Sequence, residues 1–363
     1  MSVEAMTLAP SSVPDLPSPW RLCVAPMMDW TDRHCRYFHR QLSGHARLYT
    51  EMIPIGALTH GDLPRHLDFH PDERPVALQL GGSDPAELAH GARLAERWGY
   101  SEVNLNCGCP SKRVRSGSFG ACLMSEPALV DDCIKAMRDA VSIPVTVKHR
   151  IGVDRRDDGA MAAEFVARLH RAGCSVFIVH ARSAWLDGLS PRQNREVPPL
   201  RYEVVQALKR DFPDATFVLN GGLQGIDDVR RQIAHVDGVM LGRVAYHEPW
   251  TLARLEGELF AEAIAPASMH EVLLAMTGYL ERVGAEGVPV RTVARCMLGL
   301  YHGRRGARRF RRLLSDPRFL ETHGSRSLLE AARSVHGEDG TGDSLGLPRQ
   351  AASRDLLAMP TQG

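Results

Sequence analysis

A short apolar run that ends at a pair of closely spaced cysteines is the first part of this sequence that is able to do chemistry. The run Val103–Cys107 precedes the turn Gly108–Pro110, which contains Cys109. A glycine turn followed by a thiol next to proline presents a nucleophile or proton donor at the end of a strand, where barrel enzymes keep their catalytic groups. A free cysteine is also often a small buried apolar residue without chemistry. The local sequence leaves both interpretations of Cys109 open.

Eight short apolar runs in the first two-thirds of the chain predict the strands that position this turn. Amphipathic stretches long enough for crossover helices lie between them, among them Pro85–Trp98, Glu126–Val141, Gly159–Ala172 and Tyr202–Phe212. This alternation predicts an α/β fold, specifically a (β/α)₈ TIM barrel, with a doubly wound open sheet as the alternative. The predicted strands are Leu22–Met27, Leu48–Ile53, Val76–Leu80, Val103–Cys107, Val145–Lys148, Val176–His180, Thr216–Asn220 and Gly238–Leu241.

Side chains alternate between the two faces of a strand, so the phase of each strand predicts which residues face the barrel interior. Inward polar residues end five of the strands; they are Gln79, Asn104 with Asn106, Lys148, His180 and Asn220. Leaving them without a ligand or water at the mouth would be costly, so we expect a binding site there. Cys107 has the outward phase. Of the two cysteines beside Gly108, only Cys109 is therefore expected to reach the mouth.

Glycines also follow the last two predicted strands. Gly221 and Gly222 come directly after Asn220, and Gly242 precedes Arg243. Glycine lets backbone N–H groups approach an anion closely, and the loops after strands seven and eight are the usual phosphate site of such barrels. Glycine is also the default turn residue. The placement of these glycines favours a phosphorylated cofactor.

FMN fits this mouth better than a dinucleotide does, because no Gly-x-Gly-x-x-Gly follows a strand. Lys148 would stabilise the anionic reduced flavin near N1, and Gln79 would bond the amide edge of the ring. The methionines at 27 and 28 would form an apolar wall, although methionine is also a common core residue. The predicted cofactor residues are Pro26, Met27, Met28, Gln79, Lys148, His180, Asn220, Gly221, Gly222, Gly242 and Arg243.

The composition excludes several other classes of protein. The chain has 363 residues, 44% of them hydrophobic and 24% charged, which is an ordinary soluble composition. We find no signal-peptide pattern and no window long enough to span a membrane, and therefore expect a cytoplasmic protein. The 8 cysteines form no Cys-x-x-Cys pair, so we predict no metal site and no disulfide framework.

A formal net charge of +1 gives the molecule no general attraction for nucleic acid, so such a partner needs a local basic patch. The segment 303–314 is rich in arginine with one interleaved aromatic, and Arg308, Arg311 and Arg312 share one helix face. This pattern indicates an RNA-binding surface, or alternatively a solvated helix face. We predict a barrel over residues 20–262, a small all-helical domain over 266–335, and disordered tails at 1–19 and 337–363.

Seven ordered motifs are spread over about residues 20–320. They lie at 23–32 (CVAPMMDWTD), 79–83 (QLGGS), 104–111 (NLNCGCPS), 148–152 (KHRIG), 180–182 (HAR), 220–222 (NGG) and 242–243 (GR). Together they resemble the motifs of the tRNA-dihydrouridine synthases. Two further stretches, Tyr49–Met52 and Asp187–Leu200, resemble the A subfamily specifically.

This resemblance implies NADPH-dependent reduction of the C5–C6 double bond of D-loop uridines at tRNA positions 20 and 20a. FMN would give a hydride to C6, and Cys109 would act as the general acid that protonates C5. The resemblance also assigns Asn106 to the uracil edge and Arg192, Arg195, Arg308 and Arg311 to the tRNA. We expect a monomer whose partners are tRNA and NADPH.

The chain departs from the family pattern at two positions. Cys107 replaces a small apolar residue, and His149 replaces threonine after Lys148. The outward phase of His149 predicts a packing role.

The residues leave two rival functions open. One is a small-molecule FMN oxidoreductase, which would share the cofactor site but lack the arginine-rich domain. The other is an RNA-binding protein without enzymatic activity.

Overall fold

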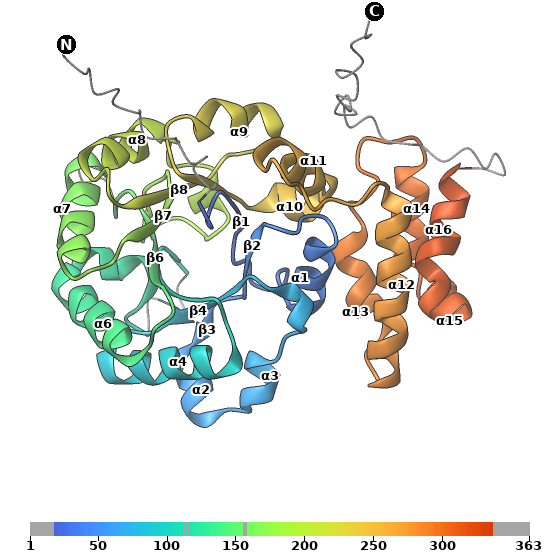
Figure 1. Cartoon of the computed structure of the whole chain (residues 1–363), viewed down its shortest axis with the longest axis horizontal. Coiled ribbons are helices and arrows are strands. Elements are labelled where there is room, and N and C mark those ends of the chain that lie inside the picture. Colours follow the sequence, from blue (N-terminus) through green and yellow to red (C-terminus); the bar gives the residue numbers. More distant parts are fainter. Residues whose placement is uncertain (1–17, 112–113, 115–116, 155–157, 337–363) are drawn as a thin grey trace, which may run out of the picture.

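The computed structural model describes residues 18–111, 114, 117–154 and 158–336 of the chain (Figure 1). The disordered tails predicted at 1–19 and 337–363 lie outside these ranges, apart from residues 18 and 19. Nine parallel strands form the sheet. They are β1 (Leu22–Val24), β2 (Arg47–Tyr49), β3 (Ile53–Pro54), β4 (Val76–Gly81), β5 (Glu102–Cys107), β6 (Val145–Arg150), β7 (Val176–His180), β8 (Thr216–Asn220) and β9 (Gly238–Leu241).

The sheet closes on itself, which confirms the predicted barrel and excludes the open sheet. The strand order is β2-β1-β9-β8-β7-β6-β5-β4-β3, and β2 also pairs with β4. The short β3 pairs only with the last two residues of β4. The other eight strands therefore make the closed barrel. Closure leaves a barrel mouth at the carboxyl ends of the strands, where the loops of such folds carry function.

Two strand predictions were too long. The first was expected to reach Met27 but ends at Val24, because Pro26 has no N–H for the ladder. The second was expected as one run to Ile53 but breaks after Tyr49 into β2 and β3. The hydroxyl of Thr50 causes the break: it accepts the backbone N–H of Gln79 at 3.0 Å, in the place of a ladder carbonyl.

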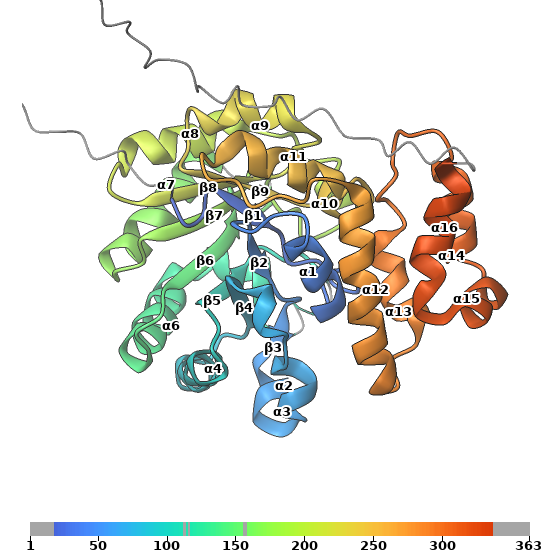
Figure 2. The same cartoon turned by 45° about the vertical axis from the view of Figure 1, so that its right-hand side comes forward.

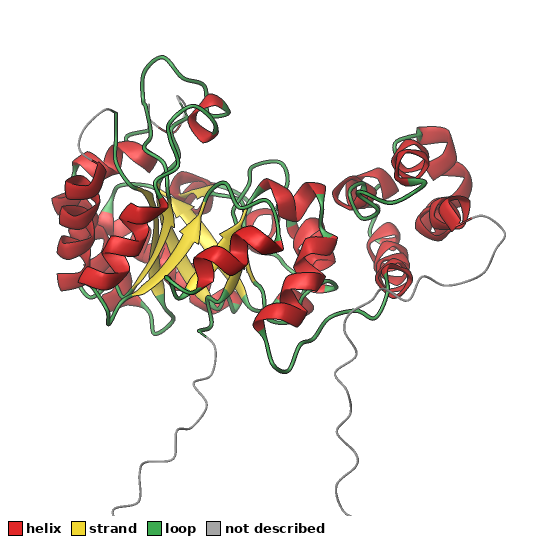
Figure 3. Cartoon of the chain, turned by 90° about the horizontal axis from the view of Figure 1, so that it is seen from above, coloured by secondary structure: helices red, strands yellow, loops and turns green. Residues whose placement is uncertain are grey.

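Helices surround the strands (Figure 3). They are α1 (Arg33–Arg40), α2 (Ile55–His60), α3 (Leu63–Leu67), α4 (Pro85–Trp98), α6 (Pro127–Ala140), α7 (Asp158–Arg171), α8 (Tyr202–Asp211), α9 (Ile226–Ile233), α10 (Arg243–His247) and α11 (Trp250–Leu259). Helix α4 has the predicted bounds because a capping residue defines each of its ends. Asp84 caps its first turn by accepting the N–H of Glu87 at 2.9 Å, and Gly99 ends it in the left-handed conformation (φ 83°).

The strand phase predicted from sequence holds throughout the core. Outward residues such as Val103, Val147 and Phe177 pack against the helices in one large apolar cluster. Inward residues such as Ile178 and Val218 form a second, smaller cluster inside the barrel. At the amino end of the barrel the interior is polar, where the buried carboxylate of Glu102 accepts hydrogen bonds from several side chains. The donors are Trp20 (2.7 Å), Tyr49 (2.8 Å) and Thr146 (2.5 Å).

A separate group of helices follows the barrel and lies beside α1 (Figures 1 and 2). It comprises α12 (Met269–Ala285), α13 (Val290–Ala294), α14 (Ala307–Leu314), α15 (Pro317–His323) and α16 (Ser327–His336). Tyr37 of α1 stacks on Tyr279 of α12 with a centroid distance of 4.1 Å, and Arg282 donates to the Tyr37 hydroxyl at 3.0 Å. An ion pair joins Arg295 to Asp32. The predicted helical region is therefore present and packed against the barrel. None of the described helices is long and apolar enough to cross a membrane.

Candidate active site at the barrel mouth

The turn after β5 places Cys109 at the carboxyl end of the barrel. The side-chain oxygen of Asn106 accepts the backbone N–H groups of Gly108 (3.1 Å) and Cys109 (3.0 Å). The Cys109 carbonyl accepts the N–H of Ala121 at 2.9 Å. Cys109 is half-buried, whereas Cys107 is fully buried among the outward side chains, as its phase predicts. Burial raises the pKa of Cys107 well above its ordinary value, so its thiol is unreactive.

A chain of buried amides crosses the interior below this turn. Gln79 donates to Asn104 at 2.7 Å, and Asn104 donates to the hydroxyl of Thr146 at 2.7 Å. Asn106 donates to the Gln79 side-chain oxygen at 2.8 Å. The amide of Gln79 therefore already holds the two asparagines of β5. This bonding fixes the Asn106 oxygen that shapes the Cys109 turn, because a buried hydrogen-bond network holds its members rigidly.

Lys148 points into the barrel from β6, as its phase predicts. Its ammonium donates to the Asn220 side chain at 3.0 Å, and Asn220 donates to the carbonyl of Met240 at 2.8 Å. Burial and the neighbouring Arg150 lower the pKa of Lys148 to about 7, against the opposing effect of the Cys109 thiol. An anion bound in the mouth would favour the charged lysine, because opposite charge stabilises the ionised form.

Cationic groups dominate the rest of the mouth. Burial, and then the charges of Arg150, Lys148, Arg182 and Arg195, hold the pKa of His180 well below its ordinary value. The imidazole is therefore neutral at pH 7, with one donor and one acceptor nitrogen. A site surrounded by positive charge attracts anionic ligands, so the mouth is suited to a phosphorylated molecule.

The loop after β8 requires glycine. Gly221 and Gly222 have φ angles of 109° and 69°, in the left-handed region that other residues avoid. A Cβ at Gly221 would lie 2.5 Å from the His180 ring, and one at Gly222 would lie 2.3 Å from a methyl carbon of Leu200. No atom lies within 4 Å of a Cβ built at Gly242, after β9. Backbone groups of this last loop are thus open to a ligand.

Two arginines supply charge at these loops. The Nε atom of Arg182 is buried and has no hydrogen-bond partner among the described residues, which is costly unless a ligand or water accepts the bond. Arg243 begins α10 and forms an ion pair with Glu196 at 2.8 Å; both side chains are about half exposed. An orphaned donor, a half-exposed guanidinium with one acidic partner and a glycine-lined loop fit a phosphate group.

The methionines after β1 differ in environment. Met27 is half-buried and packs against the cluster inside the barrel, whereas the Met28 side chain is 57% exposed. The core interpretation of Met28 is therefore wrong. Pro26 lies between these residues and the end of β1. Contact of all three with a cofactor stays a prediction.

The arginines predicted to bind tRNA lie on two separate surfaces. Arg192 and Arg195 belong to the loop after β7, where the Arg192 side chain is 82% exposed. The second surface is α14, which buries Phe310 and Leu314 against its neighbours. Among the described residues none of its exposed arginines has an acidic partner. They are Arg308, Arg309, Arg311 and Arg312.

Comparison with known proteins identifies this constellation. The family described as dihydrouridine synthase matches residues 23–335. A protein of Pseudomonas aeruginosa named tRNA-dihydrouridine(20/20a) synthase is 59% identical over 295 residues, which are 81% of this chain and 89% of that protein. Proteins of the same name from Salmonella typhimurium (298 residues, 82% and 90%) and Xanthomonas axonopodis pv. citri (296 residues, 82% and 88%) are each 53% identical.

The chain belongs to the dihydrouridine synthase family. His149 faces away from the mouth and is fully buried. Its ring packs against Phe165 and Phe177 with centroid distances of 5.2 and 6.0 Å. Burial lowers its pKa to about 4, so it stays neutral. The ring therefore lies on the outward face, as its phase predicts, and its buried Nε2 has no hydrogen-bond partner among the described residues; the packing role stays a prediction.

Three residues of the mouth were missed in the sequence. Arg150 extends β6 two residues beyond the predicted end and has the same inward phase as Lys148, so a longer strand would have found it. Asn194 is fully buried in the loop after β7, and its amide bonds both backbone groups of Trp185. Glu196 pairs with Arg243. No sequence signal marks these last two, because loop geometry decides their contacts.

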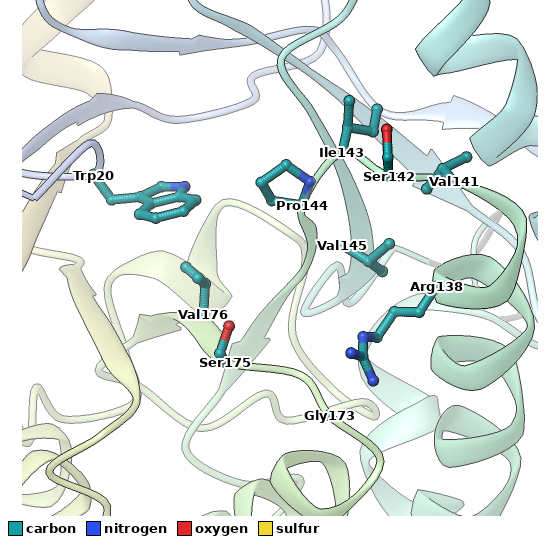
Figure 4. Close-up of a pocket in the computed structure, with 10 residues that line it drawn as sticks. All are labelled: Trp20, Arg138, Val141, Ser142, Ile143, Pro144, Val145, Gly173, Ser175 and Val176. Carbon is teal, nitrogen blue, oxygen red and sulfur yellow. The ribbon is translucent and has the colours of Figure 1, made fainter.

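A pocket of about 300 Å³ opens at the opposite end of the barrel from Cys109. Figure 4 shows Trp20, Pro144 and Arg138 around it, where β6 and β7 begin. Catalytic groups of TIM barrels lie at the carboxyl ends of the strands, whereas residues at the amino ends contribute to stability. We therefore assign no catalytic role to this pocket.

Proposed function

We propose that this protein is an FMN- and NADPH-dependent tRNA-dihydrouridine synthase that acts in the cytoplasm. It reduces the C5–C6 double bond of the D-loop uridines at positions 20 and 20a of tRNA. The observation that carries the proposal is the Cys109 turn, which Asn106 holds beside Lys148 at a cationic barrel mouth. The names of the relatives support the substrate and the two positions.

The described residues fit FMN. The Gly221–Gly222 loop, the open backbone at Gly242, and the guanidinium groups of Arg182 and Arg243 suit its phosphate. Lys148 suits the electron-rich N1 edge of the ring, and its ammonium would be more fully charged beside an anionic flavin. When bound and reduced by NADPH, FMN supplies the hydride that is added to C6 of uracil.

Cys109 completes the reduction as the general acid. Hydride addition to C6 leaves an electron pair on the C5 side of the uracil, and a new C5–H bond forms with the thiol proton. The thiolate then regains a proton from water, so the net reaction consumes one NADPH and one proton per uridine. Asn106 keeps the thiol at the mouth, and its remaining amide donor is suited to a uracil oxygen.

Access to the uridine requires that the base leave the folded RNA. A base in the D-loop that is held only by tertiary stacking is cheaper to turn out than a paired one. Arg192 and Arg195 beside the mouth, with the exposed arginines of α14, supply phosphate-binding groups on two surfaces. A tRNA that contacts both surfaces would be placed in one orientation, which selects the uridine that enters.

The two rival functions are less consistent with these observations. A small-molecule FMN oxidoreductase has no use for an array of exposed arginines that have no acidic partner among the described residues. An RNA-binding protein without activity has no use for a half-buried inward lysine and an orphaned arginine donor at a glycine-lined mouth. Both groups would cost free energy without function.

Purification of the full chain tests the proposal. We expect a yellow protein with about one FMN per chain, the one-site expectation for a barrel. NADPH should bleach the flavin spectrum without RNA, and unmodified tRNA should restore it. The Lys148→Ala variant should bind FMN more weakly or be reduced more slowly. A colourless protein that takes up no added FMN would refute the proposal, and reoxidation by free uridine as fast as by tRNA would favour the small-molecule enzyme.

A further inference from the structure

Arg150, the last residue of β6, joins two loops of the barrel mouth. Its Nε atom donates to the carbonyl of Gly108 at 2.9 Å. Its Nη1 atom donates to the carbonyls of Ser183 and Asn194 at 3.0 and 2.9 Å. Gly108 belongs to the Cys109 turn, whereas the other two belong to the loop after β7. One side chain therefore holds both loops.

The burial of this guanidinium is not explained by stability. Arg150 is 3% exposed, and its described partners are three carbonyls with no carboxylate. Burial lowers the pKa of Arg150 to about 10, which records the cost of holding the charge there. Buried charges that lack an opposite charge usually destabilise a fold relative to an apolar side chain of similar size. A group held at such a cost indicates a role in the site.

The contacts form a continuous path from the thiol to the tRNA-binding loop. Gly108 precedes Cys109 directly in the chain. On the other side, Asn194 lies between Arg192 and Arg195 in sequence, and its side chain is fixed by two hydrogen bonds to Trp185 (2.8 and 2.9 Å). The loop that carries Arg192 and Arg195 and the turn that carries the thiol are thus bonded to the same guanidinium, through the carbonyls of Asn194 and Gly108.

We propose that Arg150 is a positioning residue. It couples the position of the Cys109 thiol to the position of the loop at 183–195, which would bind tRNA. The thiol then has its working position only when the loop at 183–195 has the arrangement that tRNA requires. This inference rests on the proposed function, because it assumes that Cys109 protonates the uracil. Arg150 acts through Gly108 and does not need to touch the base.

The test uses flavin-loaded full-length protein and the variant Arg150→Lys. Lysine keeps the charge, but one ammonium cannot reproduce the fork that reaches three carbonyls. The Arg150→Met variant removes the buried charge. It is therefore expected to fold even if a lysine at this position does not. The matched control is Arg138→Lys, because Arg138 also donates to a carbonyl, that of Ala172 at 2.8 Å, but lies at the opposite end of the barrel (Figure 4).

We expect both Arg150 variants to slow flavin reoxidation at saturating tRNA by about 10- to 100-fold, since a misplacement of about 1 Å costs about 10²-fold. Flavin content, flavin reduction by NADPH and the Kd for tRNA should stay within about twofold of wild type, as should every property of Arg138→Lys. Peptide mass spectrometry should show faster alkylation of Cys109 by iodoacetamide in the variants, with less protection by tRNA than in the wild type.

Wild-type rates of reoxidation and alkylation in both Arg150 variants would overturn the positioning role. A loss of FMN or of NADPH reduction equal to the loss of reoxidation would also overturn it, because that result shows a general structural role. Failure of the proposed function looks different. In that case the wild-type protein itself would show no tRNA-dependent reoxidation.

Discussion

Replacement of Cys109 by alanine is expected to slow the reoxidation of reduced flavin by tRNA by about 10²- to 10⁴-fold, the usual contribution of a general acid. In the proposed mechanism the thiol, on the turn that Asn106 holds at the mouth, is the proton donor, and water in a closed site protonates carbon far more slowly. Reduction of the flavin by NADPH should keep its wild-type rate, because that step does not use the thiol. Stopped-flow absorbance in the two half-reactions separates the effects.

Cys107→Ala is the matched control, since it removes the same atom two residues away. Cys107 is buried among outward side chains, so its loss should reduce stability slightly and leave both half-reactions near wild type. If Cys107→Ala abolished reoxidation while Cys109→Ala did not, the assignment of the general acid would be wrong.

The second large effect is expected from the arginines of α14. The double variant Arg308→Ala/Arg311→Ala should bind tRNA more weakly. The plot of log K against log salt should become flatter by about 0.7–0.9 for each lost phosphate contact, because fewer counterions are released on binding. NADPH oxidation without tRNA should not change, since α14 lies outside the barrel. Fluorescence anisotropy of labelled tRNA over a salt series measures the slope.

Arg230→Ala provides the comparison for this experiment. Arg230 is also an exposed helix arginine, but it forms two hydrogen bonds with Glu258, at 2.7 and 2.8 Å, so little of its charge is available to RNA. Its removal should leave the salt slope as in the wild type. An equal slope for wild type and the Arg308/Arg311 variant would mean that α14 presents only a solvated face.

The barrel interior could be predicted because alternation along a strand is a local property. Once Val103 and Val147 are placed against the helices, Asn104 and Lys148 must face inward, and the hydrogen bonds of these two residues confirm it. No local pattern in the sequence predicts where the hydrogen-bond ladder between two strands ends. The break after Tyr49 depends on the Thr50 hydroxyl taking a backbone N–H from a different strand, which no local pattern indicates.

Contacts between loops were the least predictable part of the site. Asn194 stands in an unpatterned stretch, and only the folded loop shows that its amide bonds Trp185 and that its carbonyl accepts from Arg150. Glu196 likewise meets Arg243 across 47 residues of sequence. Such pairs are set by tertiary geometry and not by spacing. For this reason strand phase placed Lys148 and Asn106 at the mouth, but the loop contacts of Asn194 and Glu196 were missed.

The most direct test of the account is to map dihydrouridine in tRNA from cells that lack this gene. Mass spectrometry of D-loop fragments should show that dihydrouridine is lost at positions 20 and 20a and remains at 16 and 17. A plasmid that carries the wild-type gene should restore it, and the Cys109→Ala gene should not. Loss at 16 or 17 with positions 20 and 20a intact would contradict the assigned positions, and an unchanged dihydrouridine content would contradict the proposed function itself.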